Sequence, residues 1–196
     1  MATHNFSMFS LLPLLFSLMY FSGTADSAAS GNFIRASCKA TEYPAVCVQS
    51  LSAYASAIQK SPRQLALTAL SVSQARVESM MGFVAKLAKF KGLKAREYGA
   101  IKDCMDEMGD SVDRIRKSVR ELNNASKSKG KDFLWHMSNV ETWVSAALTD
   151  ENTCMDGFSG RALDGKIKSS IRARVTNVAQ VTSNALALVN QFAGKN

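Results

Sequence analysis

The chain has 196 residues, of which 46% are hydrophobic and 20% are charged. This length and composition fit one globular domain plus a processing segment, and they exclude a protein of several large domains. The formal net charge is +8, so the long-range partners of the chain are expected to be anionic rather than cationic.

The first predicted element is an apolar run over residues 6–21, which small residues follow. A membrane-spanning helix needs roughly 20 apolar residues, so this shorter run favours a secretory signal peptide over a membrane anchor. Cleavage is expected after Ala25 or Ser27. We therefore predict a signal peptide over residues 1–27 and a secreted, extracellular domain over residues 28–196.

Removal of the signal peptide would make the chain more basic. It takes away Asp26 and no basic residue, so the net charge rises to +9. A secreted protein has no routine access to nucleic acid. Polyanions of an extracellular matrix or a membrane surface are therefore the partners to consider. The alternative is that the excess charge only keeps the protein soluble.

Residues 28–60 are predicted to form a helical hairpin with a turn at Thr41–Pro44. Pro44 suits the first position of the second short helix, where its missing N–H costs nothing. The hairpin is too small to bury its own apolar face. It should pack on the main body of the protein or on a partner.

Four long amphipathic helices are predicted within residues 61–196, because hydrophobic residues recur alternately four and three positions apart. The inward-facing series are Ala66, Leu70, Ser73, Val77, Met80, Val84 and Leu87; Ile101, Met105, Met108, Val112, Ile115, Val119 and Leu122; Phe133, Met137, Val140, Val144 and Ala147; and Ile171, Val175, Val178, Thr182, Ala185, Val189 and Phe192. Short loops between them predict an all-α fold, an antiparallel up-down-up-down four-helix bundle preceded by the hairpin.

The ends of these helices have their own signals. Ser61 is expected to cap the first helix, with Pro62 in its first turn, and Asp132 is expected to cap the third. The third helix should open at Thr149–Asp150 into an exposed polar turn. Gly157 is expected to end that segment through the left-handed backbone angles that glycine adopts at little cost.

Four cysteines remain after processing, and an even number in a secreted chain implies two disulfides with three possible connectivities. A local hairpin can join Cys38 to Cys47. In an antiparallel bundle, Cys104 near the start of the second helix lies at the same end as Cys154 after the third. We therefore favour the pairs Cys38–Cys47 and Cys104–Cys154.

The residue inventory argues against catalysis. The favoured pairing leaves no thiol nucleophile, and His136 is the only histidine of residues 28–196. No Glu-x-x-His pair is present to build a dinuclear metal site in a bundle. We expect His136 to be a surface or half-buried residue, and we expect no catalytic residue, metal site or cofactor.

The loop between the second and third predicted helices, residues 123–131, is polar and contains the sequon Asn124-Ala125-Ser126. It is the only sequon of the predicted mature chain. Many sequons stay unmodified, so Asn124 is a candidate glycosylation acceptor and no more.

Carboxylates spaced three or four apart form an acidic stripe on the second predicted helix: Asp103, Asp106, Glu107, Asp110 and Asp113. A catalytic carboxylate pair is disfavoured, because nothing would raise one pKa among solvated neighbours. The stripe is either an ordinary solvated helix face or a docking face kept apart from the basic surface. The motif alone does not decide between these two.

The chain resembles the plant invertase/pectin methylesterase inhibitor family. The matching segments are C-K-A-T-E-Y-P-A-V-C at Cys38–Cys47, A-I-K-D-C-M-D-E-M-G-D-S-V-D at Ala100–Asp113, and T-W-V-S-A-A-L-T-D-E-N-T-C-M-D-G-F at Thr142–Phe158. The resemblance covers essentially the whole mature chain. It implies disulfides between successive cysteines and a four-helix bundle preceded by a helical hairpin.

The resemblance also implies a target. Invertase inhibitors of the family carry Pro-Lys-Phe in the loop between the second and third bundle helices, whereas this chain reads S-K-G-K-D-F at Ser128–Phe133. The segment around Cys154 is more similar to the pectin methylesterase branch. There the bundle packs across the substrate cleft of the esterase in a one-to-one complex. By position, the implied contact residues are Asp110, Asp113, Thr153 and Asp156.

The expected function is therefore inhibition of pectin methylesterase in the apoplast or cell wall. The alternatives are inhibition of a cell-wall or vacuolar acid invertase, and a non-inhibitory wall protein that binds anionic pectin through its positive charge. A further alternative is the pro-region of a larger esterase, which the end of the chain at Asn196 disfavours.

Overall fold

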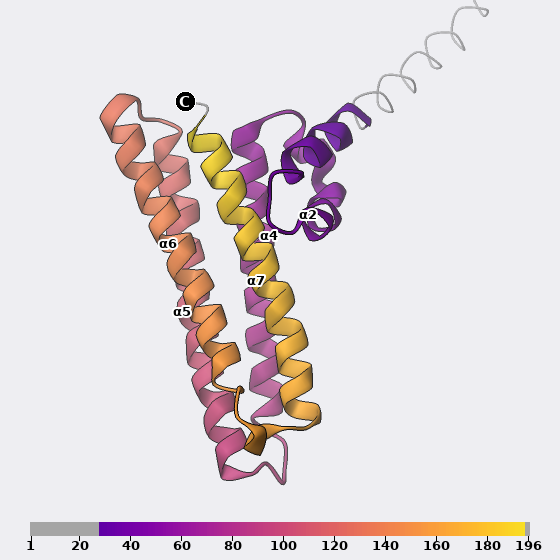
Figure 1. The fold of residues 1–196 in the computed structure, drawn as a ribbon. Helices are drawn as coiled ribbons and strands as arrows, with labels where there is room; N and C mark the ends of the chain where they lie inside the picture. The colour runs from indigo at the N-terminus through magenta and orange to yellow at the C-terminus, as the bar shows by residue number, and fades with distance from the viewer. Residues whose placement is uncertain (1–27, 195–196) are drawn as a thin grey trace, which may run out of the picture.

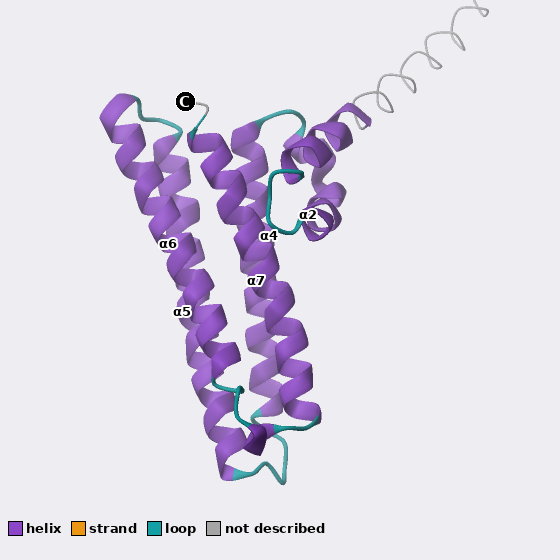
Figure 2. Ribbon diagram, viewed as in Figure 1, coloured by secondary structure: helices purple, strands orange, loops and turns teal. Residues whose placement is uncertain are grey.

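Four long helices run alternately up and down to form an antiparallel bundle (Figure 1). They are α4 (Pro62–Leu87), α5 (Ala95–Ala125), α6 (Gly130–Asp156) and α7 (Lys166–Ala193), with the short 3-10 helix η3 (Arg161–Leu163) before α7. The computed structural model describes residues 28–194, and this range contains no strand (Figure 2). The all-α four-helix bundle predicted from hydrophobic spacing is confirmed.

The start of α4 has the predicted geometry, and the start of α6 does not. The Ser61 hydroxyl accepts the Gln64 N–H at 3.2 Å, and Pro62 occupies the first helical position. At α6 the N-cap is Lys129, so the prediction that Asp132 caps this helix is wrong. The positive φ of 57° at Gly130 turns the chain into the helix earlier. Asp132 lies in the first turn of α6, where its negative charge interacts favourably with the helix dipole and stabilises the helix.

The end of α6 also differs from the prediction. The helix continues to Asp156, so the expected exposed turn from Thr149 does not exist. Gly157 does follow the last helical residue, but its φ of −55° is right-handed, so the explanation by left-handed angles is wrong. The polar residues 149–153 were misleading, because the three-and-four spacing of buried positions continues through them.

The N-terminal hairpin consists of a helical segment, residues 28–38, followed by α2 (Pro44–Leu51), the 3-10 turn η2 (Ser52–Tyr54) and α3 (Ala55–Ile58). It packs against α4 and α7 (Figure 1), as its small size led us to expect. Buried side chains of the hairpin and these two long helices belong to one hydrophobic cluster, which also includes residues of α5 and α6. The members from the hairpin, α4 and α7 include Ile34, Cys38, Cys47, Leu51, Ile58, Leu65, Leu70, Ala185 and Leu188.

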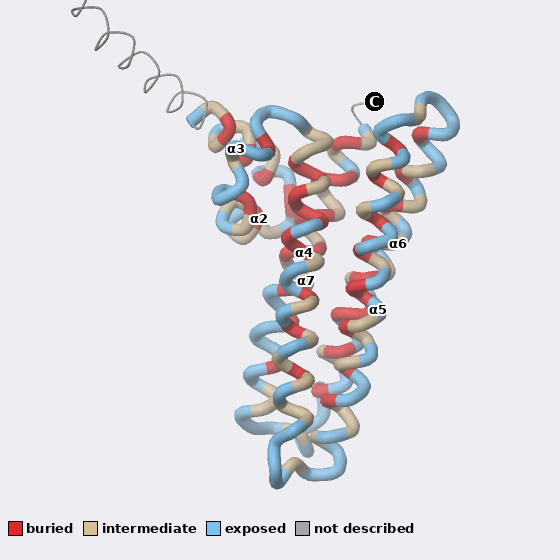
Figure 3. The backbone as a smooth tube through the Cα atoms, turned by 180° about the vertical axis from the view of Figure 1, so that it is seen from behind, coloured by how far each residue is buried: buried red, intermediate tan, exposed pale blue. Residues whose placement is uncertain are grey.

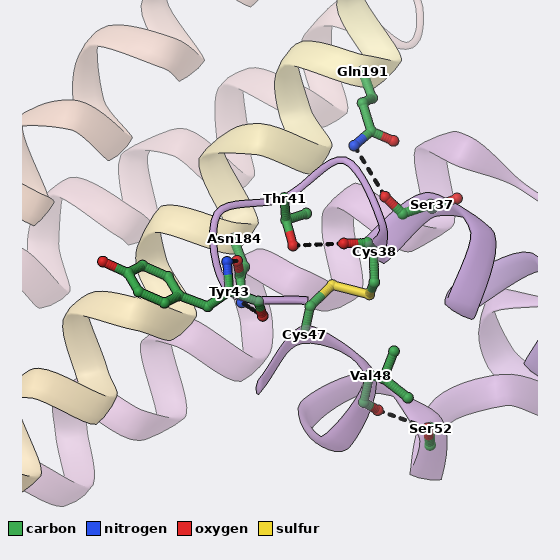
Figure 4. Close-up of a disulfide and its surroundings, with 9 residues drawn as sticks. All are labelled: Ser37, Cys38, Thr41, Tyr43, Cys47, Val48, Ser52, Asn184 and Gln191. Carbon is green, nitrogen blue, oxygen red and sulfur yellow. Dashed lines mark hydrogen bonds between the residues drawn. A yellow bond between two sulfur atoms is a disulfide. The ribbon is translucent and has the colours of Figure 1, made fainter. Parts of the chain in front are cut away.

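Polar contacts fix the position of the hairpin on α7 (Figure 4). The Asn184 side chain accepts the Tyr43 N–H at 3.0 Å and donates to the Tyr43 carbonyl at 2.9 Å. The Gln191 amide donates to the Ser37 carbonyl at 3.1 Å. Asn184 is almost fully buried, so these bonds satisfy groups that would otherwise be costly to bury.

The core follows the axis of the bundle, where buried residues of all four helices face one another (Figure 3). A second hydrophobic cluster fills the half of the bundle away from the hairpin. It includes Val77, Ile101, Met108, Ile115, Phe158, Ile171 and Val175. Of the residues that the sequence placed inward, nearly all are buried; Leu87, Met105 and Val119 are partly exposed.

The predicted disulfides, Cys38–Cys47 and Cys104–Cys154, are both formed, and residues 28–194 contain no free cysteine. The first closes the hairpin (Figure 4), and the second joins α5 to α6 with 4.3 Å between the Cα atoms. Within the same range no helix is long and apolar enough to cross a membrane. The predicted signal peptide, residues 1–27, lies outside the described residues.

Loop length predicts that the two disulfides stabilise the fold unequally. Cys104 and Cys154 are 50 residues apart and Cys38 and Cys47 are 9 apart. In the chain-entropy model their closure contributes about 4 and about 2.5 kcal/mol, respectively. We expect the C104S/C154S protein to lose more unfolding free energy than the C38S/C47S protein in denaturant titrations. Equal losses would contradict the entropic explanation.

Candidate functional site

Helices α5 and α6 are joined along their length by a series of direct contacts. In order from one end, these are the disulfide Cys104–Cys154, the ion pair from Arg114 Nε to Asp150 Oδ2 at 2.6 Å, the Lys117 Nζ at 4.5 Å from the Trp143 ring centroid, and Glu121 Oε2 at 2.6 Å from His136 Nδ1. The two helices are therefore held as one unit. The contacts between them are a covalent bond, two contacts between a carboxylate and a basic side chain, and a cation–π contact.

The acidic stripe lies on the outer side of α5. Asp103, Asp106, Asp110 and Asp113 are exposed and Glu107 is partly exposed. Asp113 contacts Arg116 at 3.4 Å, and the same guanidinium binds Glu78 of α4 at 2.9 Å. The stripe is thus solvated, which both of the open interpretations require.

The four residues singled out as contacts are all exposed, two on α5 and two on α6. Asp110 and Asp113 lie one turn apart on α5, and Thr153 and Asp156 lie one turn apart on α6. The Thr153 hydroxyl donates to the Thr149 carbonyl of its own helix at 2.9 Å. Asp156 is the last residue of α6.

The disulfide sets the relative height of these residues. Because α5 and α6 are antiparallel and Cys104 lies beside Cys154, Thr153 is level with the residue after Cys104. Asp110 and Asp113 then lie roughly 8 and 12 Å further along the axis, at 1.5 Å per residue. The four residues share one pair of helices, but they form two groups rather than one cluster.

Two buried carboxylates beneath this surface were missed by the sequence reasoning. Glu151 is fully buried on α6, where Ser111 of α5 and Thr182 of α7 donate hydrogen bonds to its Oε1 at 2.9 and 2.8 Å. Ser73 of α4 lies 2.7 Å from the Thr182 hydroxyl. One residue from each long helix therefore joins a single polar layer across the core.

Burial changes the acidity of both carboxylates. Loss of solvation raises the pKa of Glu151 to about 8, although the Thr182 and Ser111 hydroxyls oppose the rise. Loss of solvation also raises the pKa of Asp150 to about 6, against the attraction of Arg114. The charges of Glu107 and Asp110 add to that rise. Two carboxylates of the acidic stripe therefore affect the pKa of Asp150.

A signal for Glu151 was present in the sequence. The inward series Val140, Val144 and Ala147 continues, by the same steps of four and three, to Glu151 and Cys154. We stopped the helix at Thr149 because the following residues are polar. Position in the repeat was the better guide to burial than residue type.

The remaining predictions concern single residues. His136 is partly buried beside Glu121, in agreement with the prediction of a surface or half-buried residue. Asn124 lies exposed in the last turn of α5, where it is accessible to modification. No group of three or more His, Cys, Asp or Glu residues within 28–194 could hold a metal ion.

This arrangement defines a class of protein. A bundle with two disulfides presents a braced, charged surface, and within residues 28–194 the carboxylates that it buries are bonded to hydroxyls or to an arginine rather than to a nucleophile. Such a surface suits binding to another macromolecule.

Comparison with known proteins identifies the family. The family model described as plant invertase/pectin methylesterase inhibitor matches residues 32–188. The chain belongs to this family, as the resemblance of its motifs predicted. Since the family consists of inhibitors, membership also supports the expectation that the chain is not an enzyme.

The relatives agree with this placement. The chain is 60% identical to "21 kDa protein" of Daucus carota, over 93% of this chain and 95% of that protein. It is 57% identical to "Pectinesterase inhibitor 9" of Arabidopsis thaliana, over 89% and 87%. A crystal structure of a mutant pectin methylesterase inhibitor from Arabidopsis shares the fold with a TM-score of 0.63 at 22% identity, covering 78% of this chain and 92% of that one.

The buried layer predicts how stability changes with pH. The pKa of Glu151 is higher in the folded protein than its ordinary value of 4.5, so its favourable contribution is complete below pH 4.5 and is lost as the pH rises through about 8. We expect the Tm at pH 8 to be lower than at pH 5 by about 5 °C or more. Scanning calorimetry across this range measures it.

Glu151→Gln keeps an acceptor for both hydroxyls and removes the titration, so its Tm should fall less between pH 5 and pH 8. The matched control is Asp106→Asn, which removes an exposed carboxylate of α5 and should keep the wild-type slope. A Glu151→Gln protein with the same slope as wild type would contradict the assignment.

Proposed function

We propose that this chain is a secreted inhibitor of plant pectin methylesterase, which blocks the substrate cleft in a one-to-one complex and so regulates pectin demethylesterification in the cell wall. The observation that carries the proposal is the braced surface of α5 and α6, in a chain 57% identical to a pectinesterase inhibitor. Two disulfides support an oxidising, extracellular location.

The dimensions of this surface are adequate for a stable complex. A standard interface buries roughly 800 Å² on each partner. Helix α5 has 31 residues and is therefore about 46 Å long. The four proposed contact residues, Asp110, Asp113, Thr153 and Asp156, span only about a third of that length. They fit within one interface of ordinary size.

Rigidity is the second support. An inhibitor that fills a cleft needs no chemistry, but every side chain or loop that orders on binding lowers affinity. Here the contact residues lie on helices that are already joined by a disulfide and by the Arg114–Asp150 ion pair. The conformational entropy of these helices is therefore lost during folding, and little more has to be lost when the surface binds a partner.

Invertase inhibition has weaker support. The Pro-Lys-Phe motif of invertase inhibitors is missing from the loop between α5 and α6. Gly130, which begins α6 directly after that loop, has a φ of 57°, which a proline ring cannot adopt.

The test is a titration of the mature, oxidised protein against a plant pectin methylesterase and an acid invertase in parallel. We expect stoichiometric loss of esterase activity, an unaffected invertase, and a complex of one chain with one enzyme in size-exclusion chromatography with light scattering. Unchanged esterase turnover at every ratio would refute the proposal.

Carboxylates in the interface should make inhibition depend on pH across the acidic range of a cell wall. We expect the D113N/D156N protein to show a flatter pH profile and to bind roughly tenfold more weakly at the pH where wild type binds best. Surface plasmon resonance between pH 4.5 and 7 measures this. Asp132→Asn, at the opposite end of α6, is the control and should behave as wild type; an unchanged profile in D113N/D156N would exclude these carboxylates.

A further inference from the structure

The positive charge of the chain is concentrated in two short segments. Residues 86–98 and 159–172 together contain nine basic and two acidic residues, a net charge of +7, whereas the whole chain has +8. The first segment spans the loop from α4 to α5, and the second spans the connection from α6 to α7. Outside these segments the sequence is almost neutral.

The fold brings the two segments to the same end of the bundle, the end away from the hairpin (Figure 1). Leu93 of the first segment and Leu163 and Ile167 of the second pack on one hydrophobic cluster, which includes the buried Phe158. Most residues at this end are exposed (Figure 3). We refer to residues 86–98 and 159–172 as the basic end.

Part of the charge at the basic end is used internally. Lys168 donates to the carbonyls of Ser159 and Gly160 at 3.2 and 3.1 Å and pairs with Asp164 at 2.7 Å. Glu97 accepts the Lys94 N–H at the start of α5. Both acidic residues of the basic end are therefore already engaged in local hydrogen bonds.

Other cations of the basic end remain available. Seven are exposed, and no side-chain hydrogen bond or ion pair joins them to any residue of 28–194: Lys86, Lys89, Lys91, Arg96, Arg161, Lys166 and Arg172. Phe90 and Tyr98, 65% and 51% exposed, lie among them in the sequence. Charges spread over two loops and two helix starts suit an extended polyanion better than a small anion, which needs converging donors.

We propose that the basic end binds a linear polyuronate, the carboxylate-bearing chain that removal of methyl esters from pectin produces. The choice of this polyanion rests on the proposed function. The positive charge of the basic end is independent of that function, because it follows from the sequence and the fold alone. Exposed Phe90 and Tyr98 rings offer flat apolar surfaces for sugar rings beside the lysine and arginine charges.

The acidic stripe makes this binding directional. Asp103, Asp106, Asp110 and Asp113 leave the basic end along α5, so an anionic chain is repelled from the surface proposed for the esterase. The basic end begins three residues after Asp156, so a polyuronate there adjoins the Thr153 and Asp156 part of that surface and leaves the Asp110 and Asp113 part free.

The test compares two pairs of exposed lysines at opposite ends of the bundle. K89Q/K91Q removes two charges from the basic end. K127Q/K131Q removes one charge from the α5–α6 loop and one from the first turn of α6. Binding to polygalacturonate is measured by affinity electrophoresis in low salt, with highly methyl-esterified pectin and phosphatidylserine vesicles as comparison ligands. Thermal melting confirms that both variants are folded.

We expect K89Q/K91Q to bind polygalacturonate roughly tenfold to thirtyfold more weakly than wild type, at about 1 kcal/mol for each charge near an anionic surface. The affinity of K127Q/K131Q for polygalacturonate should differ from that of wild type by less than about twofold. Methyl-esterified pectin should bind weakly to all three proteins, and raising the salt should release polygalacturonate. Inhibition of the esterase should be the same for all three.

Equal weakening by the two pairs would overturn the proposal, because binding would then follow net charge alone. Binding to the vesicles without binding to polygalacturonate would also overturn it. Failure of the proposed function is a separate result: wild type and both variants would then leave the esterase active, while their ranking on polygalacturonate would still be measured.

Discussion

Glu151 is the point at which all four long helices meet through polar groups. Its carboxyl accepts hydroxyl hydrogen bonds from α5 and α7, and Thr182 contacts Ser73 of α4. Hydrophobic seams alone allow helices to slide or rotate against one another at modest cost. A fully buried carboxyl does not, because any shift that breaks these bonds leaves a polar group unsatisfied in the core. The layer therefore fixes the register of the bundle.

The same register determines what the outer surface presents. Asp150, the neighbour of Glu151, reaches Arg114 on α5, and the disulfide lies one turn further along α6. Displacing α6 along α5 would separate the carboxylates of the two helices and strain the covalent link. Core polarity, covalent bonding and surface charge thus constrain the same pair of helices, and this accounts for a preformed binding surface.

Much of the fold could be predicted from the sequence, since steps of four and three encode a helix face directly and antiparallel topology follows from short loops. The disulfide pairs followed from the same geometry. The start of α6 could not be predicted in this way, because the cap at Lys129 depends on the backbone angle of Gly130. The steps also place Glu151 inward, but they do not identify its two hydroxyl partners, Ser111 and Thr182, which lie on other helices. Residue type alone carries neither fact.

The attachment of the hairpin has a practical consequence for experiments on the isolated protein. The hairpin is held by α7 through Asn184 and Gln191, and it packs on α4 and α7 rather than on the outer side of α5 and α6 (Figure 1). An affinity handle joined ahead of residue 28 would therefore leave the α5 and α6 surface pointing away from a sensor chip or resin.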